Sequence, residues 1–317
     1  MKKKNDGGGV MRRPTFLGIG AQKCASSWIH DVLADHPDVF VSQPKEIDFF
    51  SNHYHYGFQW YVRHFAEAGR ATAIGEISPG YFWHPDVPWR VRDWMPDLRI
   101  VLALRDPVER AFSNHMHEVR KGHFRGSDLS FEAGLLNNPM YRHQSLYATH
   151  LSAWLSAFPG DRILVMLAEE VQENPVREAM RLYDFLGVSL SHRSARLFER
   201  RHESIVPRNR LLGLTLRGLG DAMRRLGLEG AVDAAKRIGP VSAVLRMNRR
   251  SLREVVPPML PQTVDRLQTE FGGEVLRLAA MLERTDLPWP TFRRATAGWD
   301  AAPASRTGTG SPALAHP

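Results

Sequence analysis

The first segment with the residues of a binding site is a glycine-containing turn at 16–28, FLGIGAQKCASSW. The apolar run Phe16–Ile19 predicts a strand, and helical spacing resumes at Trp28. Backbone N–H groups at a helix start attract anions, and Lys23 adds a positive charge. The Walker A pattern requires a glycine before its lysine, but Gln22 is there. The turn therefore predicts a phosphate loop of another kind, unless its glycines are plain turn residues and Lys23 is solvated.

A second candidate anion site follows the strongest predicted strand, RIVLAL at Arg99–Leu104. Arg105 comes directly after this strand, and Asp106 and Pro107 are typical of a helix N-cap and first helical position. Ser113 lies two turns into that helix. Ligands of α/β folds bind at the carboxyl ends of parallel strands, so Arg105 is placed to hold an anion unless it is a structural ion-pair partner. Two such sites on one sheet suit a nucleotide with phosphates at two separated positions.

Short apolar runs alternate with helical patterns along the chain. The strands expected are Phe16–Ile19, Val39–Val41, Thr72–Ile74, Arg99–Leu104 and Arg162–Leu167. The helices expected are Trp28–Leu33, Val108–Lys121, Leu146–Phe158, Pro175–Leu186 and Leu260–Leu282. Continuous apolar strands separated by helices predict a mainly parallel sheet covered on both faces, which is a three-layer α/β/α fold.

The composition permits a large packed core and favours an anionic partner. The chain has 317 residues, is 43% hydrophobic and carries a net charge of +8. Its single cysteine, Cys24, excludes an internal disulfide framework and fits a reducing compartment. No apolar run is long enough for a signal peptide or a membrane span, so we expect a cytoplasmic protein.

We expect one domain at 15–294, between a disordered basic N-terminus at 1–14 and a disordered tail at 295–317. Within the domain, residues 193–253 contain 15 Lys and Arg against five Asp and Glu. This basic segment predicts solvated helices packed on the sheet, a lid over the acceptor side, or a membrane-surface helix.

Together the motifs resemble the PAPS-dependent sulfotransferase superfamily. The pair GAQKCASSW and LRDPVERAFSNH carries the resemblance, which spans about 16–212 and again 260–289. PKEIDFF with the later Tyr61, GEISPGYF, Tyr147–Trp154 and VPRNRL resemble the heparan-sulfate-type branch and its bacterial relatives. One position departs, since Ile77 stands where heparan-type enzymes often have lysine.

The resemblance implies a P-loop-NTPase-like fold, PAPS as sulfuryl donor, PAP as product and no metal. It implies that Glu46 is the general base and that Lys23 contacts the donor near the bridging oxygen. The donor-binding residues that it implies are Gln22, Lys23, Cys24, Ala25, Ser26, Ser27, Trp28, Arg105 and Ser113, with Arg208 and Arg210 as a looser match. The acceptor-binding residues that it implies are Lys45, Ser78, Tyr81 and Tyr147.

In-line sulfuryl transfer needs a proton acceptor for the attacking group and a positive charge at the leaving oxygen. Asp48, His115 and His117 are rival bases, and Glu46 could instead be a surface carboxylate paired with Lys45. The acceptor is open among sugar hydroxyls, glucosamine nitrogens and hydroxylated or glycosylated metabolites.

Two other functions stay open: a P-loop-type nucleotide kinase, and a non-catalytic basic protein that binds anions or membranes. No aromatic stripe accompanies the basic segment, so we expect no nucleic-acid partner. Peripheral membrane contact and the oligomeric state are left open.

Overall fold

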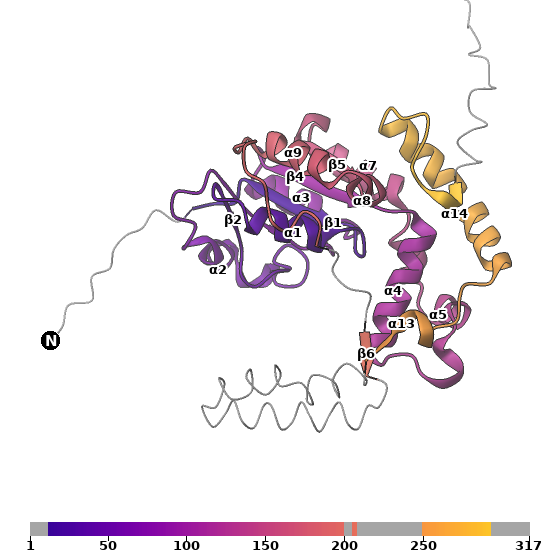
Figure 1. The fold of residues 1–317 in the computed structure, drawn as a ribbon. Coiled ribbons are helices and arrows are strands. Elements are labelled where there is room, and N and C mark those ends of the chain that lie inside the picture. Colours follow the sequence, from indigo (N-terminus) through magenta and orange to yellow (C-terminus); the bar gives the residue numbers. More distant parts are fainter. Residues whose placement is uncertain (1–11, 200–204, 208–248, 293–317) are drawn as a thin grey trace, which may run out of the picture.

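The computed structural model describes residues 12–199, 205–207 and 249–292 (Figure 1). Its centre is a five-stranded sheet in the order β2-β3-β1-β4-β5, in which all neighbouring strands are parallel. The strands are β1 (Phe16–Gly20), β2 (Val39–Val41), β3 (Ala73–Ile77), β4 (Arg99–Leu104) and β5 (Ile163–Leu167). The phosphate loop predicted after β1 and the arginine predicted after β4 therefore follow neighbouring strands.

Helices cover both faces of this sheet (Figure 1). Those up to β5 are α1 (Ser26–Ala34), α2 (Phe58–Val62), α3 (Val87–Trp94), α4 (Pro107–Lys121), α5 (Phe131–Asn137), α6 (Met140–His143) and α7 (Tyr147–Ala157). Those after β5 are α8 (Ala168–Glu173), α9 (Pro175–Leu186), α13 (Leu252–Val255) and α14 (Pro261–Met281). Because crossovers are right-handed, α1, on the connection from β1 to β2, lies on the opposite face from α3 and α7, whose connections run the other way across the sheet.

Later elements extend these two layers. Tyr183 of α9 packs edge-on against His36, just beyond α1, with ring centroids 4.6 Å apart. On the other face, Glu274 of α14 accepts a hydrogen bond of 2.8 Å from the hydroxyl of Thr149 in α7. The described part of the chain thus forms the three layers that the sequence predicts, and the predicted fold class is confirmed.

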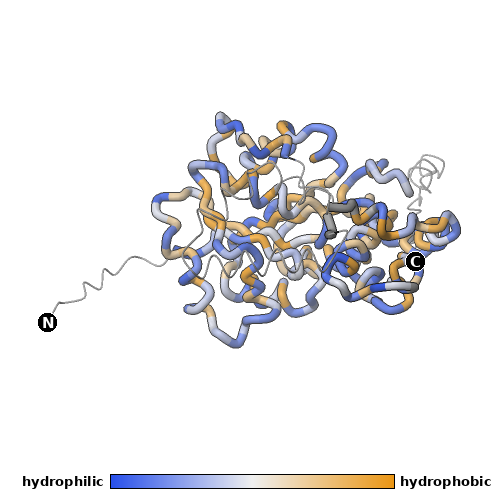
Figure 2. Tube along the Cα trace, turned by 60° about the horizontal axis from the view of Figure 1, so that its bottom comes forward, coloured by the Kyte–Doolittle hydropathy of each residue, from blue (hydrophilic) through white to orange (hydrophobic). Residues whose placement is uncertain are grey.

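The core lies along the inner strands. Every residue of β1 and β3 is buried, as are the last five of β4. Figure 2 shows hydrophobic residues along the central strands and hydrophilic ones around the outside. Continuous burial on both faces is what parallel strands between two helical layers require. It fixes the strand ends, and with them the loops that could hold a ligand.

Most predicted elements are confirmed, with two kinds of difference. The helix Pro175–Leu186 and the strand Arg99–Leu104 have the predicted bounds. The third strand is Ala73–Ile77, longer than the predicted Thr72–Ile74, because Gly75 and Glu76 continue the ladder beside β1 despite their low strand propensity. The helices α2, α3, α5, α6, α8 and α13 were not predicted as separate elements.

The basic segment at 193–253 falls mostly outside the described residues. Of its described parts, β6 (Ile205–Pro207) pairs antiparallel with β7 (Arg249–Ser251). Leu252 then packs with Val256 and with Val119 of α4.

The described residues also contain short 3-10 helices at Tyr54–Tyr56, Arg63–Phe65, Gly126–Leu129, Gly160–Arg162 and Pro290–Phe292.

Among the helices that the structure describes, none has the length and apolar character to cross a membrane.

Candidate active site

The loop between β1 and α1 has the backbone of an anion site. Lys23 and Ala25 have φ of 68° and 63°, and α1 begins directly afterwards at Ser26. Ala25, at the N-cap, has no side chain that could accept hydrogen bonds from the first N–H groups of α1. These groups are therefore left for a ligand, and the helix N-terminus favours a negative one.

The charges of two arginines, Arg105 after β4 and Arg120 in α4, act on Lys23 in this loop. Lys23 is half-buried; burial lowers the pKa of its ammonium, and the charges of Arg120 and Arg105 lower it further. Among the described residues, the Lys23 ammonium has no hydrogen-bond or ion-pair partner. Like charges brought together at the edge of a buried sheet repel one another, so the cluster is arranged for a multiply charged anion.

Gly20 allows a second segment to pack directly on the phosphate loop. A Cβ atom at this position, whose φ is 148°, would lie 2.8 Å from the Cβ of Phe82 and 2.9 Å from the carbonyl oxygen of Pro79. The amide of Phe82 donates to the carbonyl of Ile19 at 2.9 Å. Residues 78–82, which follow β3, are therefore fixed against the end of β1.

The second anion site begins at the end of β4. Arg105 lies there, with its Nη2 3.2 Å from Oε2 of Glu109. Asp106 caps α4 by accepting from the amides of Val108 at 3.0 Å and Glu109 at 3.4 Å. Ser113 lies one helical step of four residues beyond Glu109, so the two share a face of α4. The structure thus places Arg105 and Ser113 on the elements that the sequence predicts.

Tyr147 connects the two anion sites. Its buried hydroxyl donates to the carbonyl of Arg105 at 2.9 Å and lies 3.7 Å from the sulfur of Cys24. Cys24 is itself buried, and burial raises the pKa of its thiol to about 11, so it stays protonated. Tyr147 was predicted to contact the acceptor; its hydroxyl is bonded inside the protein, and an acceptor contact stays a prediction.

The loop after β2 brings Glu46 to the same end of the sheet. Lys45 donates to the hydroxyl of Ser27 at 3.1 Å and lies 3.4 Å from Oε1 of Glu46. The Glu46 carboxylate is 49% exposed, and its charge acts on Lys23. Lys45 thus links the first turn of α1 to the Glu46 loop. This is the Lys45–Glu46 pair expected of a surface carboxylate, but it lies beside the cationic cluster.

Behind this loop lies a buried carboxylate, Glu76 of β3. It accepts hydrogen bonds from the amide of Ile47 at 3.1 Å, the hydroxyl of Ser78 at 2.6 Å and the hydroxyl of Tyr81 at 2.8 Å. Burial raises its pKa to about 7, while the bonds from Ser78 and Tyr81 act in the opposite direction. Ser78 and Tyr81 were predicted to bind the acceptor, but both are fully buried and bonded to Glu76.

The rival bases differ in access. His115 is fully buried, with Nε2 2.9 Å from the carbonyl of Leu129. His117 is half-buried, and burial together with the nearby charge of Lys23 lowers its pKa to about 4, so it is neutral and a weak base at pH 7. Asp48 is half-buried, and burial and the charge of Glu46 raise its pKa. Glu46 and Asp48 are therefore the stronger candidates.

The other predicted donor-binding residues differ in what they can offer a ligand. Gln22 lies half-buried in the phosphate loop. The indole N–H of Trp28 donates to the carbonyl of Leu197 at 3.0 Å, so Trp28 and Cys24 can offer a ligand mainly their backbone. Arg208 and Arg210 lie outside the described residues.

Sequence reasoning missed Arg120 and Arg110. Arg120 lies seven residues after Ser113, and this spacing on one helix face could have identified it. Arg110 is fully buried and donates to Ser145 Oγ at 2.9 Å, Gln144 Oε1 at 3.0 Å and the Tyr141 carbonyl. These partners come from α6 and the turn after it, which no local signal on α4 reveals.

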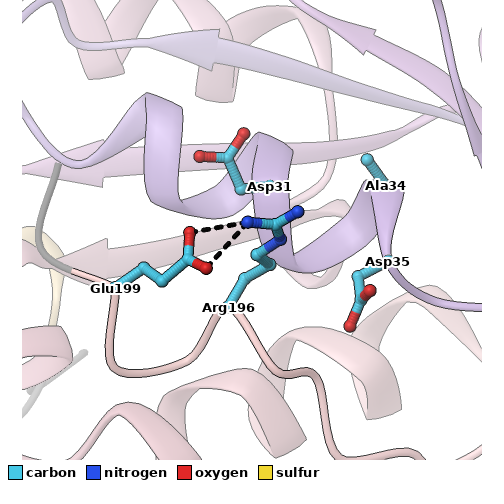
Figure 3. Close-up of a pocket in the computed structure, with 5 residues that line it drawn as sticks. All are labelled: Asp31, Ala34, Asp35, Arg196 and Glu199. Atoms are coloured by element: carbon cyan, nitrogen blue, oxygen red, sulfur yellow. Dashed lines mark hydrogen bonds and ion pairs between the residues drawn. The ribbon is translucent and has the colours of Figure 1, made fainter. Parts of the chain in front are cut away.

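A separate pocket lies beside α1 and does not suit this chemistry. It has a volume of about 230 Å³ and is lined by Asp31, Ala34, Asp35, Arg196 and Glu199 (Figure 3). Nη1 of Arg196 lies 2.7 and 2.9 Å from the two oxygens of Glu199. Three carboxylates against one guanidinium make the lining acidic, so a phosphate or sulfate is expected at the cationic cluster instead.

Comparison with known proteins assigns the fold and the loops to one family. Residues 13–206 match the family model described as the sulfotransferase domain. The chain belongs to this family. It is 25% identical to a sulfotransferase from Alicyclobacillus acidocaldarius, whose crystal structure superposes with a TM-score of 0.64 over 87% of this chain and 98% of that one. The sulfotransferase resemblance predicted from the sequence is confirmed.

Curated mammalian relatives match over part of their length. The chain is 31% identical over 197 residues to the mouse bifunctional heparan sulfate N-deacetylase/N-sulfotransferase 2, covering 56% of the chain and 22% of that protein. It is 31% identical over 191 residues to the mouse heparan sulfate glucosamine 3-O-sulfotransferase 3B1, covering 57% of the chain and 48% of that protein. These matches favour neither the kinase nor the non-catalytic basic protein.

Proposed function

We propose that this sulfotransferase moves the sulfuryl group of PAPS to a hydroxyl or amine of a carbohydrate acceptor. The observation that carries the proposal is that Lys23 and Arg105 follow the ends of the neighbouring strands β1 and β4, with the charges of Arg105, Arg120 and Glu46 all acting on Lys23. PAPS has negative charge at two separated positions, the 5′-phosphosulfate and the 3′-phosphate. The phosphate loop would hold the first, and Arg105 with Ser113 the second.

The proposed mechanism divides the charge changes between two side chains. Glu46 removes the proton from the attacking hydroxyl or amine. Because its carboxylate is half-exposed, it can then release that proton to solvent. Lys23 stabilises the charge that develops on the oxygen of the leaving PAP. Because burial and its neighbours lower the pKa of Lys23, its ammonium also holds its proton less tightly than an exposed lysine.

In this proposal Lys45 has a positioning role and also contacts the acceptor. It connects Ser27 of the donor loop with Glu46 through contacts of 3.1 and 3.4 Å. Ile77, by contrast, is buried, and its side chain fills the space above Gly18. An acceptor therefore meets no lysine at that position.

The proposed acceptor class follows the activities for which the two mammalian relatives are named. One is named as a heparan sulfate N-deacetylase/N-sulfotransferase and the other as a heparan sulfate glucosamine 3-O-sulfotransferase. A sugar amine and a sugar hydroxyl can both be deprotonated by a carboxylate base during attack. The proposal therefore includes both kinds of group.

The test measures donor binding and transfer separately. Thermal shift with PAP, with ATP and Mg²⁺, and with a DNA oligomer should show stabilisation by PAP alone. Labelled sulfate from PAPS should then enter a panel of N-unsubstituted and N-acetylated glucosamine oligosaccharides. Arg105→Ala should weaken both results, while the exposed Arg92→Ala should leave them unchanged. Equal stabilisation by ATP with Mg²⁺, or transfer to no carbohydrate, would contradict the proposal.

A further inference from the structure

The loop that carries Glu46 is held by more than the single bond from Ile47. The amide of Asp48 donates to the hydroxyl of Ser78 at 3.0 Å, and the amide of Phe50 donates to the hydroxyl of Tyr81 at 3.3 Å. Both hydroxyls then donate to Glu76. Three amides of the loop therefore converge on one carboxylate, one directly and two through hydroxyls.

All these hydrogen bonds run in the same direction. Each hydroxyl accepts from a loop amide and uses its own proton toward Glu76, so only an acceptor at position 76 satisfies both Ser78 and Tyr81. Glu76, Ser78 and Tyr81 are each fully buried. Hydrogen bonds in such a chain strengthen one another in a low-dielectric interior, and water cannot replace a lost partner.

The loop needs this support because its backbone is strained. Glu46 has φ of 64° and Asp48 has φ of 53°, both in the left-handed region that non-glycine residues rarely adopt. Such conformations persist where the surrounding structure over-determines them. The amides of Ile47 and Asp48, which come directly after Glu46, donate the hydrogen bonds that hold this conformation.

We propose that Glu76 is a positioning residue for sulfuryl transfer, which fixes the backbone of residues 46–50 and so aims the Glu46 carboxylate at the acceptor. This inference rests on the proposed function. Glu76 lies within β3 with no exposed surface, so it touches neither donor nor acceptor. Its effect should fall on turnover and not on donor binding, because its hydrogen bonds come from Ile47, Ser78 and Tyr81 and not from the phosphate loop or Arg105.

The experiment compares Glu76→Gln, Ser78→Ala and Tyr81→Phe with wild type. Glutamine keeps the shape but cannot accept at both oxygens, and the other two variants each remove one hydroxyl. Tyr183→Phe is the matched control, because the buried Tyr183 hydroxyl has no hydrogen-bond partner among the described residues. Hydrogen–deuterium exchange follows the amides of 47–50, and steady-state kinetics give kcat and the KM for PAPS.

In all three variants we expect faster hydrogen–deuterium exchange at the amides of 47–50. The other strand-end loops should exchange as they do in wild type. We expect kcat to fall about 10–100-fold in Glu76→Gln, the scale of a misplaced catalytic group, with the KM for PAPS unchanged. Tyr183→Phe should match wild type in both measurements.

Unchanged exchange at 47–50 in Glu76→Gln, or a rise in the KM for PAPS equal to the fall in kcat, would overturn the inference. Should Glu76→Gln fail to fold, Ser78→Ala and Tyr81→Phe decide it by the same two readings. Absence of sulfuryl transfer in wild type would refute the proposed function alone, since exchange still reports whether Glu76 holds the loop.

Discussion

Replacing Glu76 by glutamine should remove a pH-dependent loss of stability that the wild-type protein carries. Burial raises the pKa of Glu76 from an ordinary 4.5 to about 7. An acid whose pKa is higher in the folded than in the unfolded state binds a proton on folding. Its contribution to stability is therefore complete below pH 4.5 and is lost as the pH rises through about 7.

The size of this change in stability follows from the change in the pKa of Glu76 on folding. The pKa rises by about 2.5, which corresponds to about 3 kcal/mol, since each pKa unit is worth about 1.4 kcal/mol. No correction for solvent screening applies, because Glu76 is fully buried. Glutamine carries no titrating proton, so its lost hydrogen bond changes the free energy of unfolding by the same amount at every pH.

Urea unfolding of wild type and Glu76→Gln from pH 4.5 to 8.5 gives the free energy of unfolding of each protein. The quantity to follow is the wild-type value minus the variant value at each pH. The stability of wild type relative to the variant should fall by about 3 kcal/mol across this range, mostly between pH 5 and 8. The exposed Glu67→Gln should show no such change. A wild-type-minus-variant difference that stays constant with pH, or that grows in favour of wild type, would refute the reasoning.

Three further predictions concern the site. Glu46→Gln should lower kcat about 10²-fold or more with PAP affinity near wild type, whereas His117→Ala should keep most of its turnover; kinetics showing the reverse would assign the base to the imidazole. Arg105→Ala should weaken PAP binding by roughly 1.5–3 kcal/mol in calorimetry, and unchanged affinity would contradict the 3′-phosphate assignment. Tyr147→Phe should cost about 0.5–1.5 kcal/mol in urea unfolding, because it removes the hydrogen bond to the part-buried Arg105 carbonyl, while Tyr183→Phe should cost less; equal costs would show that the bond is not stabilising.

The parts of the site that the sequence predicts are those with local signals. A strand, a glycine turn and a helix start place Lys23, and a strand followed by an N-cap and proline places Arg105 and Ser113. These signals depend on residues within one or two turns of each other, and the parallel sheet then brings the two strand ends side by side. The loop after β2 brings Glu46 to this same edge of the sheet, and the role of Glu46 stays a prediction.

The parts that were not predicted depend on contacts between distant segments. Ser78 and Tyr81 have hydroxyls, and a sequence does not show whether a hydroxyl meets solvent or a buried carboxylate on the strand before it. Tyr147 reaches the Arg105 carbonyl from 42 residues away. Arg110 pairs with groups 31–35 residues further along. The sequence shows whether a side chain is polar, but tertiary packing decides whether it is buried and which group it binds.

The contrast between Glu46 and Glu76 shows how one fold gives the same side chain two roles. Glu46 is 49% exposed and belongs to a strained loop, so it can take a proton from an acceptor and return it to solvent. Glu76 is sealed in the sheet and accepts hydrogen bonds from Ile47, Ser78 and Tyr81, so it can neither reach an acceptor nor pass a proton to solvent. A base must exchange protons with acceptor and solvent at each turnover, whereas a positioning side chain must keep its buried partners. Since the two requirements conflict in one environment, we infer that the exposed carboxylate performs the chemistry and the buried one fixes where it happens.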